Sequence, residues 1–268
     1  MKKALTTLNV GDAYRARWER LSKKSWTAYC ERHGYDLVPI EAPLDASERA
    51  RKRSPSWQKC LILGHPVLTG YDRVVWVDSD ILINPLAPSI VEGVPPDKIG
   101  AIDESVYPSA GDRPAIIRML MAQAPRDDLM TARFLETSLD PGEFHGLVGL
   151  PKTQRHIVQA GVMVLSPVHH RTLLENVYNS YEDLGHAGYN YEMRPLSHEI
   201  QSRGWQHWID PRFNALLIWL GWLANLRSGA RPTMHEMRYF IMEQYLRNYF
   251  LHFAGCGNLM DLADFASG

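Results

Sequence analysis

The N-terminal part of the chain alternates between short apolar runs and longer stretches with helical spacing. Lys3–Leu8 and 35–40 are predicted strands, and 12–33 between them carries apolar residues at helical spacing. A Ser-Pro pair then opens a predicted helix over 54–68, because Ser can cap a helix and Pro fits its first turn. Arg73–Val77 follows as a strand whose continuous apolar run indicates burial on both faces.

This order of strand, helix, strand, helix, strand predicts an α/β fold of the Rossmann-like kind, with a mostly parallel sheet flanked by helices. In such sheets ligands bind beyond the carboxyl ends of the strands. The residues directly after Val77 are therefore the first place to look for a site. The length of 268 residues fits a single domain.

The rest of the chain carries the same two kinds of pattern at wider intervals. Further strands are predicted at 98–102, 157–165, 205–209 and 249–253. Further helices are predicted at 113–136, 166–181, 191–203 and 236–247. Pro125 breaks the first of these helices, and 141–152 is predicted to be loop. Strands and helices are therefore predicted along the rest of the chain, with 166–181 and 191–203 as consecutive helices.

Composition and charge restrict the class of partner. Lys and Arg number 29 against 30 Asp and Glu, so the chain lacks the positive field that nucleic acid or an anionic membrane surface would favour. No apolar run reaches the length of a membrane span, and the stretch before Asn9 is too short for a signal sequence. The 3 cysteines are widely spaced and form no CxxC pair, which argues against a disulfide framework and a zinc site. We therefore expect a small-molecule partner, no transmembrane segment and a cytoplasmic location.

The triplet after the buried strand, Asp78-Ser79-Asp80, is the first candidate for chemistry. On an extended chain the two carboxylates project to the same side, so Asp78 and Asp80 can share one cation while Ser79 points elsewhere. Oxygen ligands suit Mg²⁺ or Mn²⁺, which would neutralise a diphosphate as a sugar–phosphate bond breaks. The competing interpretation is an ordinary turn at a strand end, since Asp and Ser favour turns. The position after a buried strand favours the metal site.

A second candidate lies in the last predicted strand, 249–253, which carries His252 and leads into a turn at Gly255. His252 is a candidate third ligand, and one nitrogen among oxygens favours Mn²⁺ over Mg²⁺. Backbone can approach a phosphate closely at Gly255, because glycine has no side chain. A buried structural histidine is the competing interpretation, and it is the commoner case for one His among 11.

Four short motifs gain weight from their order along the chain. They are Trp57 with Lys59, Trp-Val-Asp-Ser-Asp at 76–80, Gln-Ala-Gly-Val at 159–162 and His-Phe-Ala-Gly-Cys at 252–256. In this order and approximate spacing the chain resembles the galactosyl/mannosyl/xylosyltransferase family of fungal mannan and plant xyloglucan synthesis, over nearly its whole length. The resemblance implies a GT-A fold and transfer with retention of configuration from a UDP- or GDP-sugar bound through Mn²⁺. It also implies metal ligation by Asp78, Asp80 and His252, with Ser79 facing the ribose.

The chain departs from that family where the diphosphate would be held. After the His-Phe-x-x-Cys stretch the family usually has a Lys that grips the diphosphate, whereas this chain has Gly257 and Asn258. Arg53 and Lys59 flank the start of the helix before the metal strand, and they are the candidate cations for that role.

Two further departures fall where the donor sugar would lie. The family's Asn in the third motif is Gln159 here, and its Asp-Gln pair becomes Glu192-Met193. We expect Glu192 and Gln159 near the anomeric carbon or the acceptor hydroxyl, against the alternative that Glu192 is a solvated residue in a first helical turn. In GT-A proteins the end of the first strand holds base and ribose, and the candidates there are Thr6, Thr7, Asn9 and Tyr14. Tyr14 could stack on the base or pack within its helix.

The expected organisation is a single GT-A domain with a nucleotide-binding half at 1–84, a half for donor sugar and acceptor at 85–256, and a tail at 257–268. The expected activity is metal-dependent transfer of a hexose or pentose to a hydroxyl on a glycan, lipid-linked or small-molecule acceptor. Two alternatives stay open: a nucleotide-sugar-binding protein with weak catalysis, and a sugar-nucleotide nucleotidyltransferase. The latter would need a Gly-rich loop with Lys or Arg after the first strand, which 9–12 does not supply.

Overall fold

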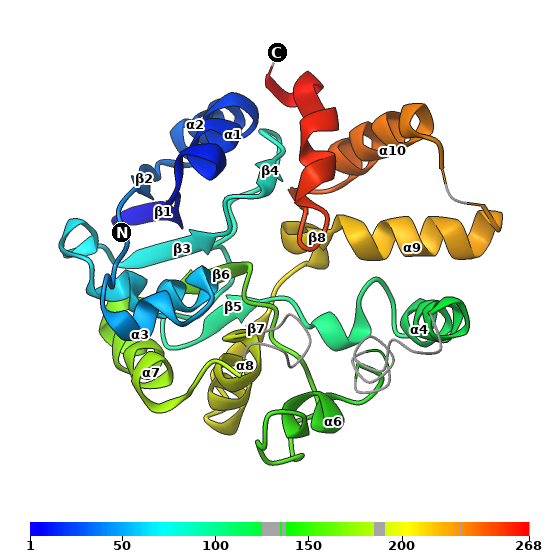
Figure 1. Ribbon diagram of the computed structural model, residues 1–268. Coiled ribbons are helices and arrows are strands. Elements are labelled where there is room, and N and C mark those ends of the chain that lie inside the picture. Colours follow the sequence, from blue (N-terminus) through cyan, green and yellow to red (C-terminus); the bar gives the residue numbers. More distant parts are fainter. Residues whose placement is uncertain (125–134, 136–137, 185–190, 231, 268) are drawn as a thin grey trace.

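A computed structural model describes residues 1–124, 135, 138–184, 191–230 and 232–267, which form one α/β domain (Figure 1). The strands are β1 Lys3–Leu8, β2 Asp36–Ile40, β3 Arg73–Val77, β4 Ile81–Ile83, β5 Ile99–Ala101, β6 Val162–Leu165, β7 Gln206–Trp208, β8 Ala215–Leu216 and β9 Phe250–His252. The α-helices are α1 Asp12–Leu21, α2 Lys23–His33, α3 Glu48–Arg51, α4 Asp112–Gln123, α6 Pro141–Gly146, α7 Pro167–Ser180, α8 Met193–Ser202, α9 Leu217–Ser228 and α10 Met234–Arg247. The 3-10 helical segments are η1 Pro55–Gly64, η2 Pro66–Leu68, η3 Glu104–Val106, η4 Pro211–Asn214 and η5 Gly257–Ser267.

The central sheet has the strand order β2-β1-β3-β6-β5-β7. β2, β1 and β3 run parallel, as do β5 and β7, whereas β6 is antiparallel to both of its neighbours. The mostly parallel sheet is therefore confirmed, but β3 has a parallel neighbour on only one side. The reason is that the chain leaves β5 at its C-terminal end and returns beside that same end, where Asp103 bridges Val158 in antiparallel fashion, so β6 runs back between β3 and β5.

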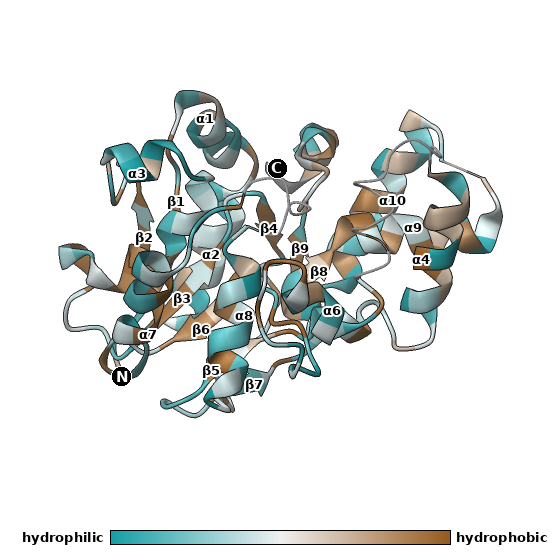
Figure 2. Ribbon diagram, turned by 60° about the horizontal axis from the view of Figure 1, so that its bottom comes forward, coloured by the Kyte–Doolittle hydropathy of each residue, from teal (hydrophilic) through white to brown (hydrophobic). Residues whose placement is uncertain are grey.

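β3 is buried along its whole length, and its alternate side chains enter two separate cores. Val74 and Trp76 pack in a core shared with α7 and α8, whereas Val75 and Val77 pack in a core shared with α1 and α2. Figure 2 shows the apolar colour of β3 and β6 at the centre of the fold. Helices therefore cover both faces of the sheet, and the ends of its strands are left for ligands.

A second sheet of three strands, β4-β9-β8, brings the C-terminal part of the chain to the end of β3. Ile81 on β4 pairs with His252 on β9, and the N–H of Phe253 donates to the carbonyl oxygen of Asp80 at 3.0 Å. His252 therefore lies beside Asp80, although the two are far apart in the sequence.

Two of the predicted helices are not continuous α-helices in the structure. The helix predicted over 12–33 is divided at Ser22 into α1 and α2. The helix predicted over 54–68 is 3-10 helical in η1 and η2, and it is interrupted where Pro66 lacks an N–H donor.

Four other predicted ranges differ in extent. The loop predicted over 141–152 contains α6, because the carboxylate of Asp140 accepts from two N–H groups at its start. Only the end of the strand predicted over 157–165 is regular, as β6, and the tail at 257–268 forms η5. α4 ends before the proline in 113–136, and the rest of that prediction lies almost entirely outside the described residues. The remaining predicted elements lie within two residues of those observed. In the described ranges, no helix combines the length and apolar character needed to cross a membrane.

Candidate metal centre and nucleotide cleft

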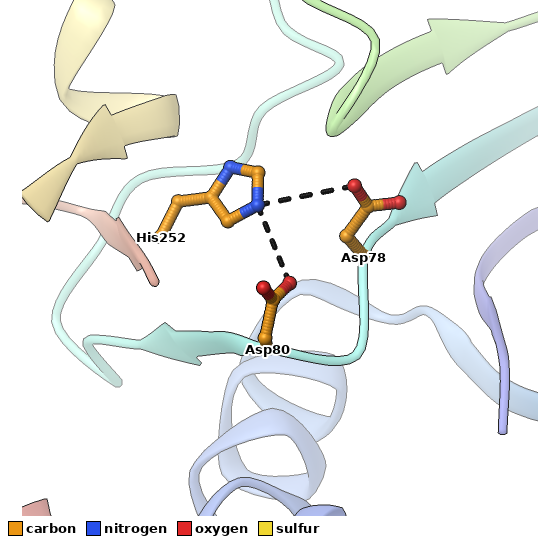
Figure 3. A group of neighbouring side chains, drawn as sticks. All are labelled: Asp78, Asp80 and His252. Atoms are coloured by element: carbon orange, nitrogen blue, oxygen red, sulfur yellow. Dashed lines mark ion pairs between the residues drawn. The ribbon is translucent and has the colours of Figure 1, made fainter. Parts of the chain in front are cut away.

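Three side chains that can bind metal converge at the carboxyl end of β3. One ligand atom each from Asp78, Asp80 and His252 lie within 4.8 Å of one another. The Nε2 atom of His252 is 3.3 Å from Oδ1 of Asp80 and 3.8 Å from Oδ2 of Asp78. Figure 3 shows the imidazole ring pointing toward both carboxylates. His252 is buried, whereas the side chains of Asp78 and Asp80 are 25% and 33% exposed. Protein thus closes one side of the cluster and leaves the carboxylates partly open.

Backbone and indole hydrogen bonds hold Asp78 in place. Its N–H donates to the carbonyl oxygen of Gly161 at 2.8 Å, which anchors the triplet to the loop before β6. The Nε1 of Trp76 donates to Oδ1 of Asp78 at 2.8 Å. Because Trp76 belongs to β3 and Gly161 directly precedes β6, both partners are tied to the central sheet, and the indole orients the carboxylate of Asp78 without a bound ligand.

A series of amide hydrogen bonds orients His252. Oδ1 of Asn214 lies 2.8 Å from Nδ1 of His252, and because an amide oxygen only accepts, Nδ1 carries the proton and Nε2 faces the carboxylates. Nδ2 of Asn214 donates to Oε1 of Gln159 at 2.7 Å, which also accepts from the N–H of Gly161 at 2.5 Å. A Cβ at Gly161 would collide with the imidazole ring, so only glycine leaves room for it. Outer hydrogen bonds of this kind fix the tautomer of a metal-binding histidine.

Lys59 joins the cluster from η1. Its Nζ lies 3.0 Å from Oδ1 of Asp78 and 3.0 Å from Oε1 of Glu192, and the side chains of Lys59 and Glu192 are only 5% and 6% exposed. Burial alone would lower the pKa of Lys59, but the two carboxylates raise it, so Lys59 stays charged. Glu192, at the start of α8, is therefore buried and paired, not solvated.

The three candidate ligands shift one another's ionisation. Burial raises the pKa of Asp78 against the opposing charge of Lys59. Burial would also raise the pKa of Asp80, but the charge and the hydrogen bond of His252 lower it. The same pairing raises the pKa of His252, although burial acts in the opposite direction. The cluster therefore attracts positive charge to the point between its carboxylates, where a divalent cation would also be held.

The donor set fits such a cation. Asp78 and Asp80 offer hard oxygen atoms and His252 offers one nitrogen, a combination that suits Mn²⁺ and also Mg²⁺. The room left by Gly161 and the fixed tautomer of His252 both favour ligation through Nε2.

Two adjoining cavities open beside the cluster and share Tyr14, Ser79 and Asp80; together we call them the cleft. The first, of about 300 Å³, lies between the end of β1, the start of η1 and the triplet. The second, of about 400 Å³, lies between α1 and the turn that follows β9. The carboxyl end of β3 thus opens onto both cavities.

The cleft collects some of the residues predicted to hold the nucleotide. Tyr14, Lys59, Asp78, Ser79 and Gly255 all line it. Tyr14 is 60% exposed, so it does not simply pack within its helix. These five residues come from four separate segments of the chain, which the fold brings to one place.

The three candidates from the first strand do not line the cleft. Thr6, Thr7 and Asn9 are buried, and Leu8 and Val10 line the first cavity instead. The reason is that successive side chains of a strand point to opposite faces, so Thr7 and Asn9 face away from Leu8 and Val10. Thr6 lies deeper on the cleft side. Its hydroxyl donates to the carbonyl oxygen of Val38 on the neighbouring strand β2, at 2.7 Å.

Arg53 is also absent from the described lining of the cleft. Its guanidinium packs on the rings of Trp57 and Tyr178 and donates to the carbonyl oxygen of Tyr178 at 2.6 Å, at the end of α7. It also donates to the carbonyl oxygen of Tyr181 and pairs with Glu182 at 3.2 Å. Carbonyl groups at a helix C-terminus attract cations. Of the two cations predicted to grip the diphosphate, only Lys59 reaches the carboxylates.

Sequence reasoning missed Asn214 and Arg17, as well as Leu8 and Val10 in the lining of the first cavity. Asn214 orients His252, but no local pattern marks it, because its partner is remote in sequence. Arg17 lines the second cavity. Its spacing of three residues from Tyr14 on a predicted helix could have indicated that both share one face.

One of the comparisons with known proteins supports the fold. No protein-family model matches the chain, and no curated protein matches it by sequence. Among solved structures, the chain is similar to a glycosyltransferase involved in the glycosylation of the major capsid of PBCV-1, with a TM-score of 0.54 and 15% identity over 96% of this chain and 99% of that one. The galactosyltransferase LgtC, in complex with donor and acceptor sugar analogs, gives a TM-score of 0.46 and 12% identity over 97% and 95%. The glycosyltransferase GlyE in Streptococcus pneumoniae gives 0.48 and 12% over 94% and 55%.

The likeness to the capsid glycosyltransferase shows that this chain has the fold of a GT-A glycosyltransferase, as predicted. At 15% identity this structural likeness establishes the fold of the chain and nothing about its activity. The more specific resemblance to the mannan and xyloglucan family stays a prediction.

Proposed function

We propose that the chain is a metal-dependent glycosyltransferase that moves a hexose or pentose from a UDP- or GDP-sugar to a hydroxyl of a glycan, lipid-linked or small-molecule acceptor. The convergence of Asp78, Asp80 and His252 beside the cleft carries this proposal. It lies at the carboxyl end of a buried strand, where α/β sheets bind ligands.

Asp78, Asp80 and His252 would hold Mn²⁺, or Mg²⁺ as the second choice. When bound, the metal neutralises the diphosphate and stabilises the charge that develops on it. The chain's own part is to keep the ligands in position: Asn214 holds the ring of His252, and Trp76 holds the carboxylate of Asp78.

In this proposal the nucleotide lies in the first cavity. Leu8, Val10 and Tyr14 form an apolar and aromatic surface suited to a base, and Ser79 is placed for the ribose. Thr6, Thr7 and Asn9 would then support the end of β1 from within the core, without direct contact to the nucleotide. The nucleotide-binding half at 1–84 supplies all of these residues.

Glu192 is the carboxylate proposed to lie near the anomeric carbon. It is held by Lys59, which also contacts Asp78, so one buried cation links it to the metal cluster. Gln159 acts on the position of His252 in this proposal, because its Oε1 is already occupied by two donors. The residues from 85–256 thus complete the donor-sugar side.

The proposed transfer retains the donor's configuration. The bond from the anomeric carbon to the phosphate oxygen breaks, and its electron pair stays on that oxygen. The acceptor oxygen forms the new bond on the same face, and its proton passes to the departing phosphate. Glu192 would stabilise the positive charge that develops on the sugar. NMR of the first product should show an α-linkage from an α-linked donor, and a β-linkage would rule out retention.

We also propose a cytoplasmic setting. Cys30, Cys60 and Cys256 are all free and buried thiols, which agrees with a reducing compartment.

The decisive experiment measures UDP and GDP affinity by calorimetry with Mn²⁺, with Mg²⁺ and with EDTA. Without a cation the carboxylates repel the diphosphate, so EDTA should abolish binding, and Mn²⁺ should restore it better than Mg²⁺. A nucleotide affinity that does not change with metal would contradict the proposed function.

A further inference from the structure

The second cavity of the cleft has a cationic wall. Arg17 projects from α1 and lines this cavity together with Ser79 and Asp80, and Gly255, Gly257 and Asn258 form another part of the lining. The side chain of Arg17 is 35% exposed. The cavity thus places a guanidinium beside the carboxylate end of the proposed metal site.

The cluster lacks the positive charge needed to balance a bound diphosphate, and this guanidinium can supply part of it. Three carboxylates, Asp78, Asp80 and Glu192, face a single lysine, so the cluster keeps two negative charges. One divalent cation offsets those two charges and no more. A nucleoside diphosphate would then bring its own negative charges into a partly buried, neutral site, where unpaired charge is costly.

Lys59 is not available to these charges, because its Nζ is shared between Asp78 and Glu192. Among the described residues that line the cleft, the other cation is Arg17. A guanidinium presents several N–H donors in a planar fork that matches phosphate oxygens.

Arg17 is weakly engaged within the protein. Its Nη2 lies 3.6 Å from Oδ2 of Asp261, whereas Arg20, one turn later on α1, makes the closer contact to the same carboxylate. One carboxylate therefore faces two guanidinium groups. Since Arg20 already neutralises Asp261, Arg17 can turn to a ligand without leaving a carboxylate unpaired.

The opposite wall admits a phosphate closely. Gly255 has a φ of 70°, which L-residues rarely adopt, and Gly257 has open space where a Cβ would stand. Backbone there can approach an anion without side chains in between.

We propose that Arg17 binds the donor's diphosphate across the second cavity and supplies, from α1, the cationic contact that neither Arg53 nor Lys59 can make. This inference rests on the proposed function. As the sugar leaves and negative charge grows on the diphosphate, the contact strengthens, so Arg17 also favours bond breaking.

The test uses calorimetry on the full chain with saturating Mn²⁺ and three probes: inorganic pyrophosphate, UDP and UMP. Arg17→Gln should weaken pyrophosphate and UDP about tenfold to a hundredfold, the range expected for one charge-assisted hydrogen-bonding contact. UMP affinity should change far less, and Arg17→Lys should keep part of the diphosphate affinity. The ratio of UDP to UMP affinity separates a diphosphate contact from a general loss of structure.

Arg15→Gln is the matched control, because it removes an arginine from the same helix that pairs with Asp12 and Glu41 and is absent from the described lining of the cleft. It should change all three affinities by less than about threefold, as an exposed charge is screened by solvent. Equal losses in Arg17→Gln and Arg15→Gln, or no loss in Arg17→Gln, would overturn this inference while the proposed function stands. A wild-type protein that binds neither UDP nor pyrophosphate with Mn²⁺ would overturn both.

Discussion

Two clusters of charged residues contain similar residue types but differ in how their charges are paired. The metal cluster consists of Asp78, Asp80, His252, Lys59 and Glu192, and the α7-end cluster consists of Arg49, Arg53, Glu182 and the carbonyl groups of Tyr178 and Tyr181. In the α7-end cluster each guanidinium donates to carbonyl oxygens of the chain and pairs with Glu182. In the metal cluster carboxylates outnumber the lysine, and the excess charge borders a cavity.

The difference shows what separates a binding site from a structural ion-pair cluster. Residue types alone do not separate them, because Arg53 and Lys59 both lie near the start of η1 and both are buried. What matters is whether each charged side chain is paired with an opposite charge or a hydrogen-bonding group of the protein. An excess of unpaired charge next to a cavity costs free energy and therefore indicates that a ligand binds there.

The largest expected effect removes a metal ligand. Asp80→Asn should lower the transfer rate about a thousandfold or more, since the stabilisation that the metal supplies is worth several kcal/mol. The free energy of unfolding should change by no more than about 1 kcal/mol, because Asp80 is 33% exposed and its loss relieves repulsion from Asp78. Product assays and urea unfolding at pH 7 test both parts. If the variant unfolds, Asp80 is a structural residue and the contrast between the clusters fails.

The second-largest expected effect concerns Asn214, which contacts the proposed metal ligand His252 and not the metal itself. Asn214→Ala should weaken Mn²⁺ affinity about tenfold to a hundredfold, because the ring of His252 loses the partner that fixes its tautomer. Asn84→Ala is the control, since Asn84 is also buried but bonds the carbonyl groups at the end of α10. Both variants should lose stability, and only the first should lose Mn²⁺ affinity in a titration followed by calorimetry. Equal Mn²⁺ affinity in the two would argue against His252 as a ligand.

A third prediction addresses the α7-end cluster itself. Arg53→Met should lower the free energy of unfolding by about 2 kcal/mol, because the carbonyl oxygens of Tyr178 and Tyr181 lose a charged donor. UDP affinity in the presence of Mn²⁺ should stay within experimental error of wild type. Urea unfolding and calorimetry on the same preparation give both values. A selective loss of UDP affinity would return Arg53 to the nucleotide site.

The smallest effect concerns an exposed carboxylate of the same cluster. The hydrogen bond from Arg53 holds the pKa of Glu182 below its ordinary value, so its contribution to stability is present above that value and is lost as pH falls below it. Glu182→Gln should remove this pH dependence and change stability at pH 7 by no more than about 0.5 kcal/mol, since the side chain is 70% exposed. Thermal unfolding from pH 7 to pH 3 measures it. A larger change would mean that Glu182 is essential to the cluster.

Much of the fold was predictable from the sequence, because local patterns specify it. The apolar run of β3 and the helical spacing in α7 and α10 appear where they were predicted. The antiparallel return of β6 was not predictable, since periodicity along one strand says nothing about the direction of its neighbour. α6 was missed because a short capped helix rests on one side chain, Asp140, and not on a repeated apolar pattern.

For the candidate site, the sequence by itself determined which groups are present and that Asp78 and Asp80 directly follow a buried strand. The extended geometry expected for the triplet was wrong, because Ser79 and Asp80 form a turn between β3 and β4, and the turn brings the two carboxylates together. Only the tertiary structure decided that His252 meets them, that Asn214 sets its tautomer, that Lys59 rather than Arg53 joins them, and that Arg17 borders the cavity beyond. It also decided that Leu8 and Val10, not Thr7 and Asn9, line the cleft. Each of these depends on contacts between segments far apart in the chain, or on which side of a strand faces open space. Such facts arise from packing, and local sequence carries no record of them.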